Sequence, residues 1–194
     1  LDEVFPSDPQ QLMLVKGQLD QLNRLVGDLH LLSLARAGQL AMEKSLFSVS
    51  SLVSERLEWA SPQLAVANVI TQVDVGPELM LLADRDRLGQ VLSILIDNLI
   101  LYAAQGQCLE IKVSQCESAL HLIVADRGPG VEDDQLTRIF DRFWRAESSR
   151  ARPLGGTGLG LSIASAICDA HGGSISAYNR EGGGLAIRMS IPYG

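Results

Sequence analysis

The first forty residues carry a repeating pattern of apolar side chains. From Gln10 onward apolar residues recur at alternating steps of three and four, which is typical of a helix that presents one narrow seam to a partner helix. The seam residues are Leu12, Val15, Leu19, Leu22, Val26 and Leu29. Gly38 predicts the end of this helix. Because no later segment offers a matching seam, we expect this helix to be one half of a helical hairpin whose other half lies upstream.

The remaining residues alternate between short strand patterns and longer helical patterns. Helices are predicted at 50–60, 84–104 and 158–171, the first ending before Ser61-Pro62 because the residue before a proline avoids helical geometry. Strands are predicted at 47–49, 66–75, 78–83, 109–115, 119–125, 174–179 and 185–191. The predicted fold is therefore an α+β two-layer sandwich, a mixed and mainly antiparallel sheet with helices on one face, preceded by a separate helix.

Composition and charge narrow the class of protein. The 194 residues are 46% hydrophobic and 20% charged, enough for a sizeable core. A net charge of −7 argues against a protein whose main partner is nucleic acid. Three cysteines without ligand spacing fit a reducing compartment. No apolar run approaches the ~20 residues that span a bilayer. Since the chain begins with Leu1, we expect it to be part of a longer protein.

Asn98 is the first residue with candidate chemistry. It lies within the predicted helix 84–104, and its neighbours one turn away are apolar. A buried amide is costly unless it is hydrogen-bonded, so one interpretation is a core asparagine bonded to backbone. The other is an amide oxygen that ligates Mg²⁺, a cation that usually shares its ligand shell with substrate phosphates.

Two glycine-containing motifs follow. Residues 126–130, Asp-Arg-Gly-Pro-Gly, come directly after a predicted strand; they suit either a plain turn or a carboxylate that binds a donor such as a purine amino group. Residues 155–161, Gly-Gly-Thr-Gly-Leu-Gly-Leu, open a helix whose N–H groups suit a phosphate, although a hinge would also use such glycines. A dinucleotide-binding loop needs a strand directly before its glycines, and residues 148–154 contain two arginines and a proline instead.

The order of these motifs resembles the catalytic and ATP-binding domain of sensor histidine kinases. Residues 84–103 resemble the N box of that family, 126–130 its first glycine box, 139–145 (Ile-Phe-Asp-Arg-Phe-Trp-Arg) its F box and 155–161 its second glycine box. Residues 24–29 and 32–35 resemble the second helix of its dimerisation and phosphotransfer hairpin. The resemblance thus divides the chain into a partial hairpin, residues 1–43, and a catalytic and ATP-binding domain, residues 44–194.

The resemblance implies a set of nucleotide contacts. Asp126 would read the adenine amino group, Tyr102 would pack beside the base, and Asn98 would hold Mg²⁺ against the triphosphate of ATP. The backbone amides of the second glycine box would cradle the phosphates; these residues are Gly156, Thr157, Gly158, Leu159 and Gly160.

The resemblance also implies a lid over the nucleotide. Gly128 and Gly130 would begin this lid, and Phe140 and Phe143 would anchor it on apolar surface. Arg142, Arg145 and Arg150 lie where such a lid could meet phosphate charge. Arg145 joins Asn98 as a candidate catalytic residue, whereas Arg150 fits ordinary solvated surface better.

The partners expected from the resemblance are ATP, a histidine-bearing hairpin of the same or a sister subunit, and the receiver domain of a response regulator, within a homodimer and without nucleic acid. The acceptor histidine is missing: His30, His121 and His171 lack the acidic and Leu-Arg-Thr-Pro-like neighbours of the family's acceptor, and His171 lies near a helix end where a cation is mildly favoured. We expect the chain to bind ATP without autophosphorylating, as the cytoplasmic part of an inner-membrane sensor.

Two departures leave a second hypothesis open. Ile94 and Leu101 stand where the family commonly has a polar residue and a lysine or arginine. Loss of both favours the alternative of a nucleotide-binding regulatory module with weak or no kinase activity. A related ATPase that clamps onto DNA or a chaperone client shares the glycine boxes, but the acidic charge and the hairpin-like helix speak against it.

Overall fold

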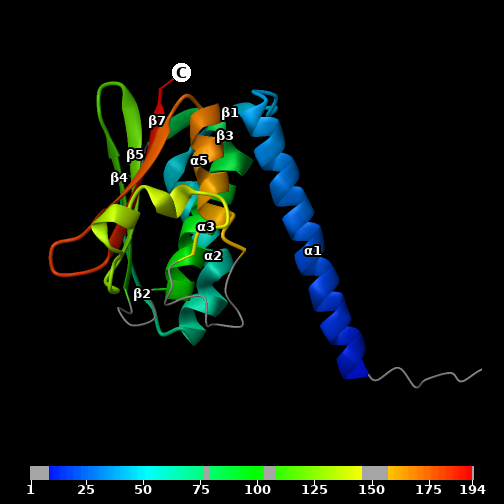
Figure 1. Ribbon diagram of the computed structural model, residues 1–194. Coiled ribbons are helices and arrows are strands. Elements are labelled where there is room, and N and C mark those ends of the chain that lie inside the picture. The colour runs from blue at the N-terminus through cyan, green and yellow to red at the C-terminus, as the bar shows by residue number, and fades with distance from the viewer. Residues whose placement is uncertain (1–8, 77–78, 103–107, 146–156, 194) are drawn as a thin grey trace, which may run out of the picture.

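The computed structural model describes residues 9–76, 79–102, 108–145 and 157–193. A five-stranded sheet is covered on one face by the helices α2 (Val49–Val66), α3 (Arg85–Tyr102) and α5 (Gly160–Ala170) (Figure 1). The long helix α1 (Pro9–Arg36) stands apart from this sandwich and approaches it only at its C-terminal end, beside α5. The predicted fold class is therefore confirmed.

The main sheet has the strand order β2-β4-β5-β7-β6. Its strands are β2 (Ile70–Val75), β4 (Cys108–Gln115), β5 (Ala119–Asp126), β7 (Leu185–Pro192) and β6 (Ser174–Asn179). Only β2 and β4 run parallel, and the other three neighbouring pairs are antiparallel. The sheet is thus mixed and mainly antiparallel, as predicted.

A separate two-stranded ribbon contains β1 (Lys44–Ser48) and β3 (Met80–Asp84). The sequence suggested that the strand before Gly76 and the strand after Pro77 flank a common turn, yet β2 and β3 belong to different sheets. Pairing β3 with β1 places Phe47 opposite Leu81, and both side chains are buried in the core. Such long-range packing cannot be read from a local turn signal.

The helix α2 extends further than predicted. It begins at Val49 and continues through Pro62 to Val66, so the predicted end before Ser61-Pro62 is wrong. Proline removes one backbone hydrogen bond from a helix interior. Burial of Ala60 and Leu64 on either side of Pro62 outweighs that loss, because both side chains pack into the core.

Other helix ends follow the sequence signals. The Oδ1 atom of Asp84 accepts a hydrogen bond of 3.0 Å from the backbone N–H of Arg87, which caps α3 as predicted. Gly38 and Gly172 have φ angles of +66° and +72° and follow the ends of α1 and α5. These local signals fix where α3 begins and where α1 and α5 end.

The helix α1 is the exposed part of the molecule. All six seam residues are between 44% and 59% exposed, whereas Leu31 and Leu32 near its C-terminal end are buried in the core. The seam of α1 therefore lies exposed in the single chain. No helix in the described parts of the chain is long and apolar enough to cross a membrane.

Candidate functional site

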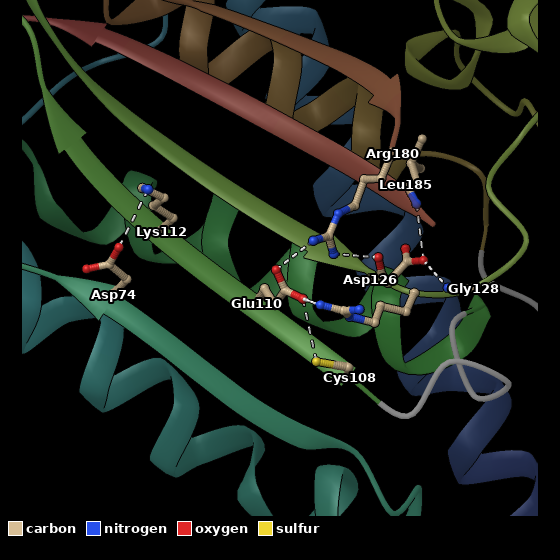
Figure 2. A network of polar contacts seen from close by, with 9 residues as sticks. Asp74, Cys108, Glu110, Lys112, Asp126, Gly128, Arg180 and Leu185 are labelled. Atoms are coloured by element: carbon tan, nitrogen blue, oxygen red, sulfur yellow. Dashed lines mark hydrogen bonds and ion pairs between the residues drawn. The ribbon is translucent and has the colours of Figure 1, made fainter. Parts of the chain in front are cut away.

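Asp126 is the last residue of β5, and its carboxylate is held by the backbone on one side only. Oδ1 accepts hydrogen bonds from the N–H groups of Gly128 at 2.7 Å and Leu185 at 3.2 Å (Figure 2). Among the residues that the structure describes, none donates a hydrogen bond to Oδ2. One carboxylate oxygen is thus fixed and the other is left to accept a hydrogen bond from a ligand.

The loop after Asp126 is held against the β6–β7 hairpin. Gly128 is buried, and Gly130 has a φ of +71°. A Cβ atom at Gly130 would lie 2.6 Å from Oδ1 of Asn179. That same Oδ1 accepts a hydrogen bond of 3.1 Å from the N–H of Val131, while Nδ2 of Asn179 donates to the Val131 carbonyl at 2.7 Å. The first glycine box is therefore positioned by a strand end more than forty residues further along the chain.

A charged network lies beside Asp126. The Glu110 carboxylate, on β4, accepts hydrogen bonds from Arg127 at 2.8 Å and from Arg180 at 2.7 Å (Figure 2). Hydrogen bonding to Arg180, and then to Arg127, lowers the pKa of Glu110. Arg180 also donates to the backbone carbonyl of Asp126 at 2.9 Å.

The second glycine box opens α5. Gly158 has a φ of +73°, and Oγ1 of Thr157 accepts a hydrogen bond of 3.3 Å from the N–H of Leu159. Leu159 occupies the N-cap position of α5 without a side-chain cap, and the helix begins at Gly160. The first N–H groups of a helix lack partners within the helix, so this end suits an anion.

The F box contacts the second glycine box through its backbone. The N–H of Phe143 donates to the carbonyl of Gly158 at 2.9 Å, and a Cβ atom on Gly158 would lie 2.8 Å from the Phe143 carbonyl carbon. Phe143 has a φ of +62°, which is rare for a bulky residue, and its side chain is 60% exposed. Phe140 packs against the core, whereas Phe143 is exposed.

Asn98 lies on α3, half-buried, and its side-chain amide forms no hydrogen bond with any other described residue. One turn earlier on the same helix, Cγ2 of Ile94 lies 3.2 Å from the position that a Cβ atom on Gly160 would occupy. The N box and the second glycine box therefore meet where α3 packs on α5. The interpretation of Asn98 as a core residue bonded to backbone is not borne out.

The remaining predicted residues are placed as follows. Arg142 is exposed and Arg145 is half-buried. Tyr102 ends α3, and its side chain lies outside what the structure describes, as do Gly156 and Arg150 altogether. The structure thus brings together the N box, the F box and the second glycine box, with Asp126 at the end of a neighbouring strand.

Residues 83–194 match the family described as histidine kinase-, DNA gyrase B- and HSP90-like ATPases. The chain belongs to this family. The signal transduction histidine-protein kinase BaeS of Escherichia coli K12 is 35% identical over 191 residues, which cover 98% of this chain and 41% of BaeS. The chain therefore spans less than half of the length of this relative.

Solved structures agree with this assignment. The histidine kinase AdeS of Acinetobacter baumannii has a TM-score of 0.83 at 30% identity and covers 100% of this chain and 89% of its own. Full-length ShkA, solved in complex with AMPPNP, has a TM-score of 0.84 at 25% identity over 95% of this chain and 38% of its own. The resemblance of this ATPase to sensor histidine kinases, drawn from four short motifs, is confirmed.

The histidines of this ATPase differ in their surroundings. His171 is buried; its Nε2 accepts a hydrogen bond of 3.2 Å from the N–H of Asp84, and its Nδ1 lies 2.8 Å from the Ile167 carbonyl. Burial lowers the pKa of His171, which opposes the mild preference for a cation expected from its place near a helix end. His30 is exposed on α1, and His121 is half-buried on β5.

Sequence reasoning missed three residues of the candidate site. Glu110, Asn179 and Arg180 surround Asp126 and its loop, yet they come from β4 and from the β6–β7 hairpin. The available signal was the run Gly182-Gly183-Gly184, which predicted the hairpin turn without revealing what the turn approaches. A Cβ atom on Gly184 would lie 2.1 Å from the carbonyl oxygen of Asp126, which explains why glycine stands there.

Proposed function

We propose that this chain binds ATP with Mg²⁺ and transfers the γ-phosphoryl group to a histidine on a hairpin helix, for relay to an aspartate of a response regulator. The observation that carries the proposal is the Asp126 carboxylate, one oxygen of which is held by two backbone N–H groups while the other has no donor among the described residues. The amino group of adenine is a donor of the required kind. The complex of the related ShkA with AMPPNP supports nucleotide binding.

The residues of the N box and the second glycine box fit a metal-bound triphosphate. The half-buried Asn98 has an amide without a partner among the described residues, and the uncapped first turn of α5 offers backbone N–H groups. Mg²⁺, when bound, neutralises phosphate charge. Asn98 would hold it, the amides from Gly156 to Gly160 would hold the phosphates, and Arg142 and Arg145 would add positive charge. Tyr102 would pack beside the base, and Gly128, Gly130, Phe140 and Phe143 would support a lid.

The proposal includes the organisation of the longer protein. Residues 1–43 would supply the second helix of a dimerisation and phosphotransfer hairpin, and residues 44–194 the catalytic domain, within a homodimeric sensor on the cytoplasmic side of the inner membrane. The exposed seam of α1 supports this division, since it lacks a partner helix in the single chain. None of His30, His121 and His171 would accept the phosphoryl group, and both ring nitrogens of His171 are engaged.

Calorimetry tests nucleotide binding. We expect ADP and ATP to bind, ATP more tightly with Mg²⁺ than without. Asp126→Ala should weaken ADP binding by about 10- to 100-fold, the range for a hydrogen bond to a charged group. Asp74→Ala is the matched control, because Asp74 is an exposed aspartate on the edge strand β2 of the same sheet, whereas Asp126 ends the central strand β5. Unchanged ADP affinity in Asp126→Ala would overturn the proposed function.

A transfer assay tests the chemistry. The chain is mixed with labelled ATP and a separately supplied acceptor hairpin, and the label should appear on the hairpin and not on the chain. Asn98→Ala should abolish the advantage that Mg²⁺ gives ATP while leaving ADP binding without metal within about twofold. Label on the chain alone would contradict the assignment of its histidines.

A second function is favoured by one observation. Ile94 places an apolar side chain against Gly160 where the family commonly has a polar residue, and Leu101 replaces a common basic residue. Loss of a preorganised donor costs on the order of 10²-fold in rate, so a nucleotide-binding regulatory module with little kinase activity would show such changes. The double variant Ile94→Asn, Leu101→Lys should then raise phosphoryl transfer sharply, whereas unchanged transfer would exclude this alternative.

A further inference from the structure

The β6–β7 hairpin reaches across the sheet to the end of β5. Ala125 is the last residue of β5 that pairs with β7, opposite Ala186, so the main-chain ladder stops one residue before Asp126. Two contacts from the hairpin continue beyond that point. The N–H of Leu185 donates to the Asp126 side chain, and the Arg180 guanidinium donates to the Asp126 carbonyl oxygen at 2.9 Å. Asp126 still pairs with Leu109 of β4, so Arg180 replaces a strand partner only on the β7 side.

The Arg180 guanidinium is itself fixed. One of its nitrogens, Nη2, donates to Oε2 of Glu110 at 2.7 Å while Nη1 holds the Asp126 carbonyl (Figure 2). The side chains of Arg180 and Glu110 are only 22% and 24% exposed, whereas the side chain of Arg127, the other partner of Glu110, is 58% exposed. A planar guanidinium held at two points by half-buried acceptors loses little further freedom when a ligand binds.

The same contact controls local charge. Glu110 and Asp126 belong to adjacent strands, with Glu110 opposite Ala125. Hydrogen bonding to Arg180 lowers the pKa of Glu110 and keeps this second carboxylate ionised but occupied. Without Arg180, the Asp126 carbonyl would lose this donor, and Oε2 of Glu110 would become a competing acceptor beside the base-reading aspartate, while Oε1 would stay bound to Arg127.

We propose that Arg180 is a positioning residue for nucleotide selection: by bridging Glu110 to the Asp126 backbone, it fixes the Asp126 carboxylate so that Oδ2 accepts a hydrogen bond from the amino group of adenine. The inference rests on the proposed function and extends it to a specificity-determining residue in the β6–β7 hairpin, outside the four boxes. It concerns the choice of base and not phosphoryl transfer.

The experiment compares ADP with IDP, which carries a carbonyl oxygen where ADP carries the amino group. The wild-type chain should bind ADP more tightly than IDP, because a carboxylate rejects a ligand without the donor. Arg180→Met should lower the ratio of ADP to IDP affinity about tenfold, mainly through ADP. Arg180→Lys, which keeps the charge but cannot form both bonds, should give an intermediate ratio.

Two arginines serve as matched controls. Arg188 belongs to the same hairpin but lies over the ring of Tyr178, 5.6 Å from its centroid, and Arg127 binds Glu110 without touching the Asp126 carbonyl. Arg188→Met and Arg127→Met should both leave the ratio within twofold of the wild type. Circular dichroism of each variant checks that it is folded.

The outcomes separate the two proposals. A wild-type chain that binds neither nucleotide, or that binds ADP and IDP equally, overturns the proposed function and this inference with it. A selective wild-type chain whose Arg180 variants keep the same ratio, even with weaker binding of both nucleotides, shows that Arg180 is merely structural. A loss of selectivity in Arg127→Met equal to that in Arg180→Met also overturns the inference.

Discussion

The two ends of the candidate nucleotide site are built differently. At the base end, Asp126 belongs to a central strand and is held by backbone N–H groups, a guanidinium and a glycine that admits no side chain. At the phosphate end, the site comprises the first turn of α5, the unpartnered amide of Asn98 among the described residues, and a turn at Phe143 with a positive φ. One end is rigid before a ligand binds, and the other keeps unsatisfied groups.

This difference indicates a division of labour. A carboxylate held in place before binding favours selection of the base at little entropic cost. Unsatisfied N–H and amide groups at the other end gain partners only when a charged ligand arrives. Variants at the base end should therefore change which base is preferred, and variants at the phosphate end should change how tightly the phosphates or their Mg²⁺ are held, whatever the base.

The largest effect is expected for Gly184→Ala at the base end. The new Cβ atom would lie 2.1 Å from the Asp126 carbonyl oxygen in a residue with φ of +105°. Backbone strain and overpacking together predict a loss of about 3 kcal/mol or more in the free energy of unfolding, with loss of ADP selectivity. Urea denaturation measures the first and calorimetry with ADP and IDP the second.

Gly182→Ala is the matched control for that variant. Gly182 has a φ of +85°, but a Cβ atom there would meet nothing within 4 Å. The free energy of unfolding should fall by only about 1–2 kcal/mol, because an alanine there would strain only the left-handed backbone. Equal destabilisation by the two variants would show that the contact with Asp126 does not constrain the hairpin.

Gly158→Ala should have the next largest effect, at the phosphate end. Its Cβ atom would press on the Phe143 backbone at 2.8 Å, which should separate the F box from the second glycine box and cost about 2 kcal/mol. ADP and IDP affinities should fall together, leaving their ratio unchanged. The comparison is Gly38→Ala, where φ is +66° and no atom lies within 4 Å. A change in the ratio would break the distinction between the two ends.

A pH effect of intermediate size is expected at the far end of α5. Burial lowers the pKa of His171, and the nearby Lys44 lowers it further, against opposing contributions from the Ile167 carbonyl and Asp84. Unfolded histidine titrates near pH ~6.5, so below that pH the unfolded chain binds more protons. Stability should therefore fall as the pH drops from about 6.5 towards the lowered pKa, by at most ~1.4 kcal/mol per pH unit.

Urea denaturation between pH 7.5 and 5 measures this effect. His171→Gln should be less stable at neutral pH and should lack the slope, whereas His30→Gln, at an exposed position on α1, should keep it. Asp84 contributes to stability in a lower pH range. Burial raises its pKa, but hydrogen bonds from the N–H groups of Arg87 and Glu43 lower it overall. The stabilisation by Asp84 should therefore be lost only below about pH 4. A wild-type slope retained in His171→Gln would contradict the assignment.

The smallest effect is expected at the exposed ion pair of β2 and β4. Lys112 and Asp74 are 3.7 Å apart, with side chains 62% and 78% exposed (Figure 2). Lys112→Ala should change the free energy of unfolding by less than about 1 kcal/mol and leave nucleotide selectivity unchanged. A larger loss in urea denaturation at moderate salt would mean that β2 depends on this pair.

Local signals in the sequence predicted some of the elements correctly and missed others. The Asp84 cap, the glycines after α1 and α5, and the two late hairpins were all readable, because each depends on residues close together in the chain. The end of α2 could not be predicted in this way, since burial of Leu64 keeps the chain helical beyond Pro62. The separation of β2 from β3 was equally invisible, because it depends on partners elsewhere in the chain.

The candidate site shows the same limit. Asp126, Asn98 and the glycines stand in motifs with a recognisable order, so their presence follows from the chain alone. The exposure of Phe143 and the lowered pKa of the buried His171 do not, because both depend on what packs around them.

The order of motifs in the chain was enough to indicate the family, the layered α+β architecture and the aspartate that we propose reads the base, since these depend on residue types at short spacing. Folding was needed to bring Arg180 and Glu110, seventy residues apart, to either side of Asp126. The physical reason is that strand order brings distant residues together, and no local pattern of apolar and polar positions encodes which strand will become the neighbour.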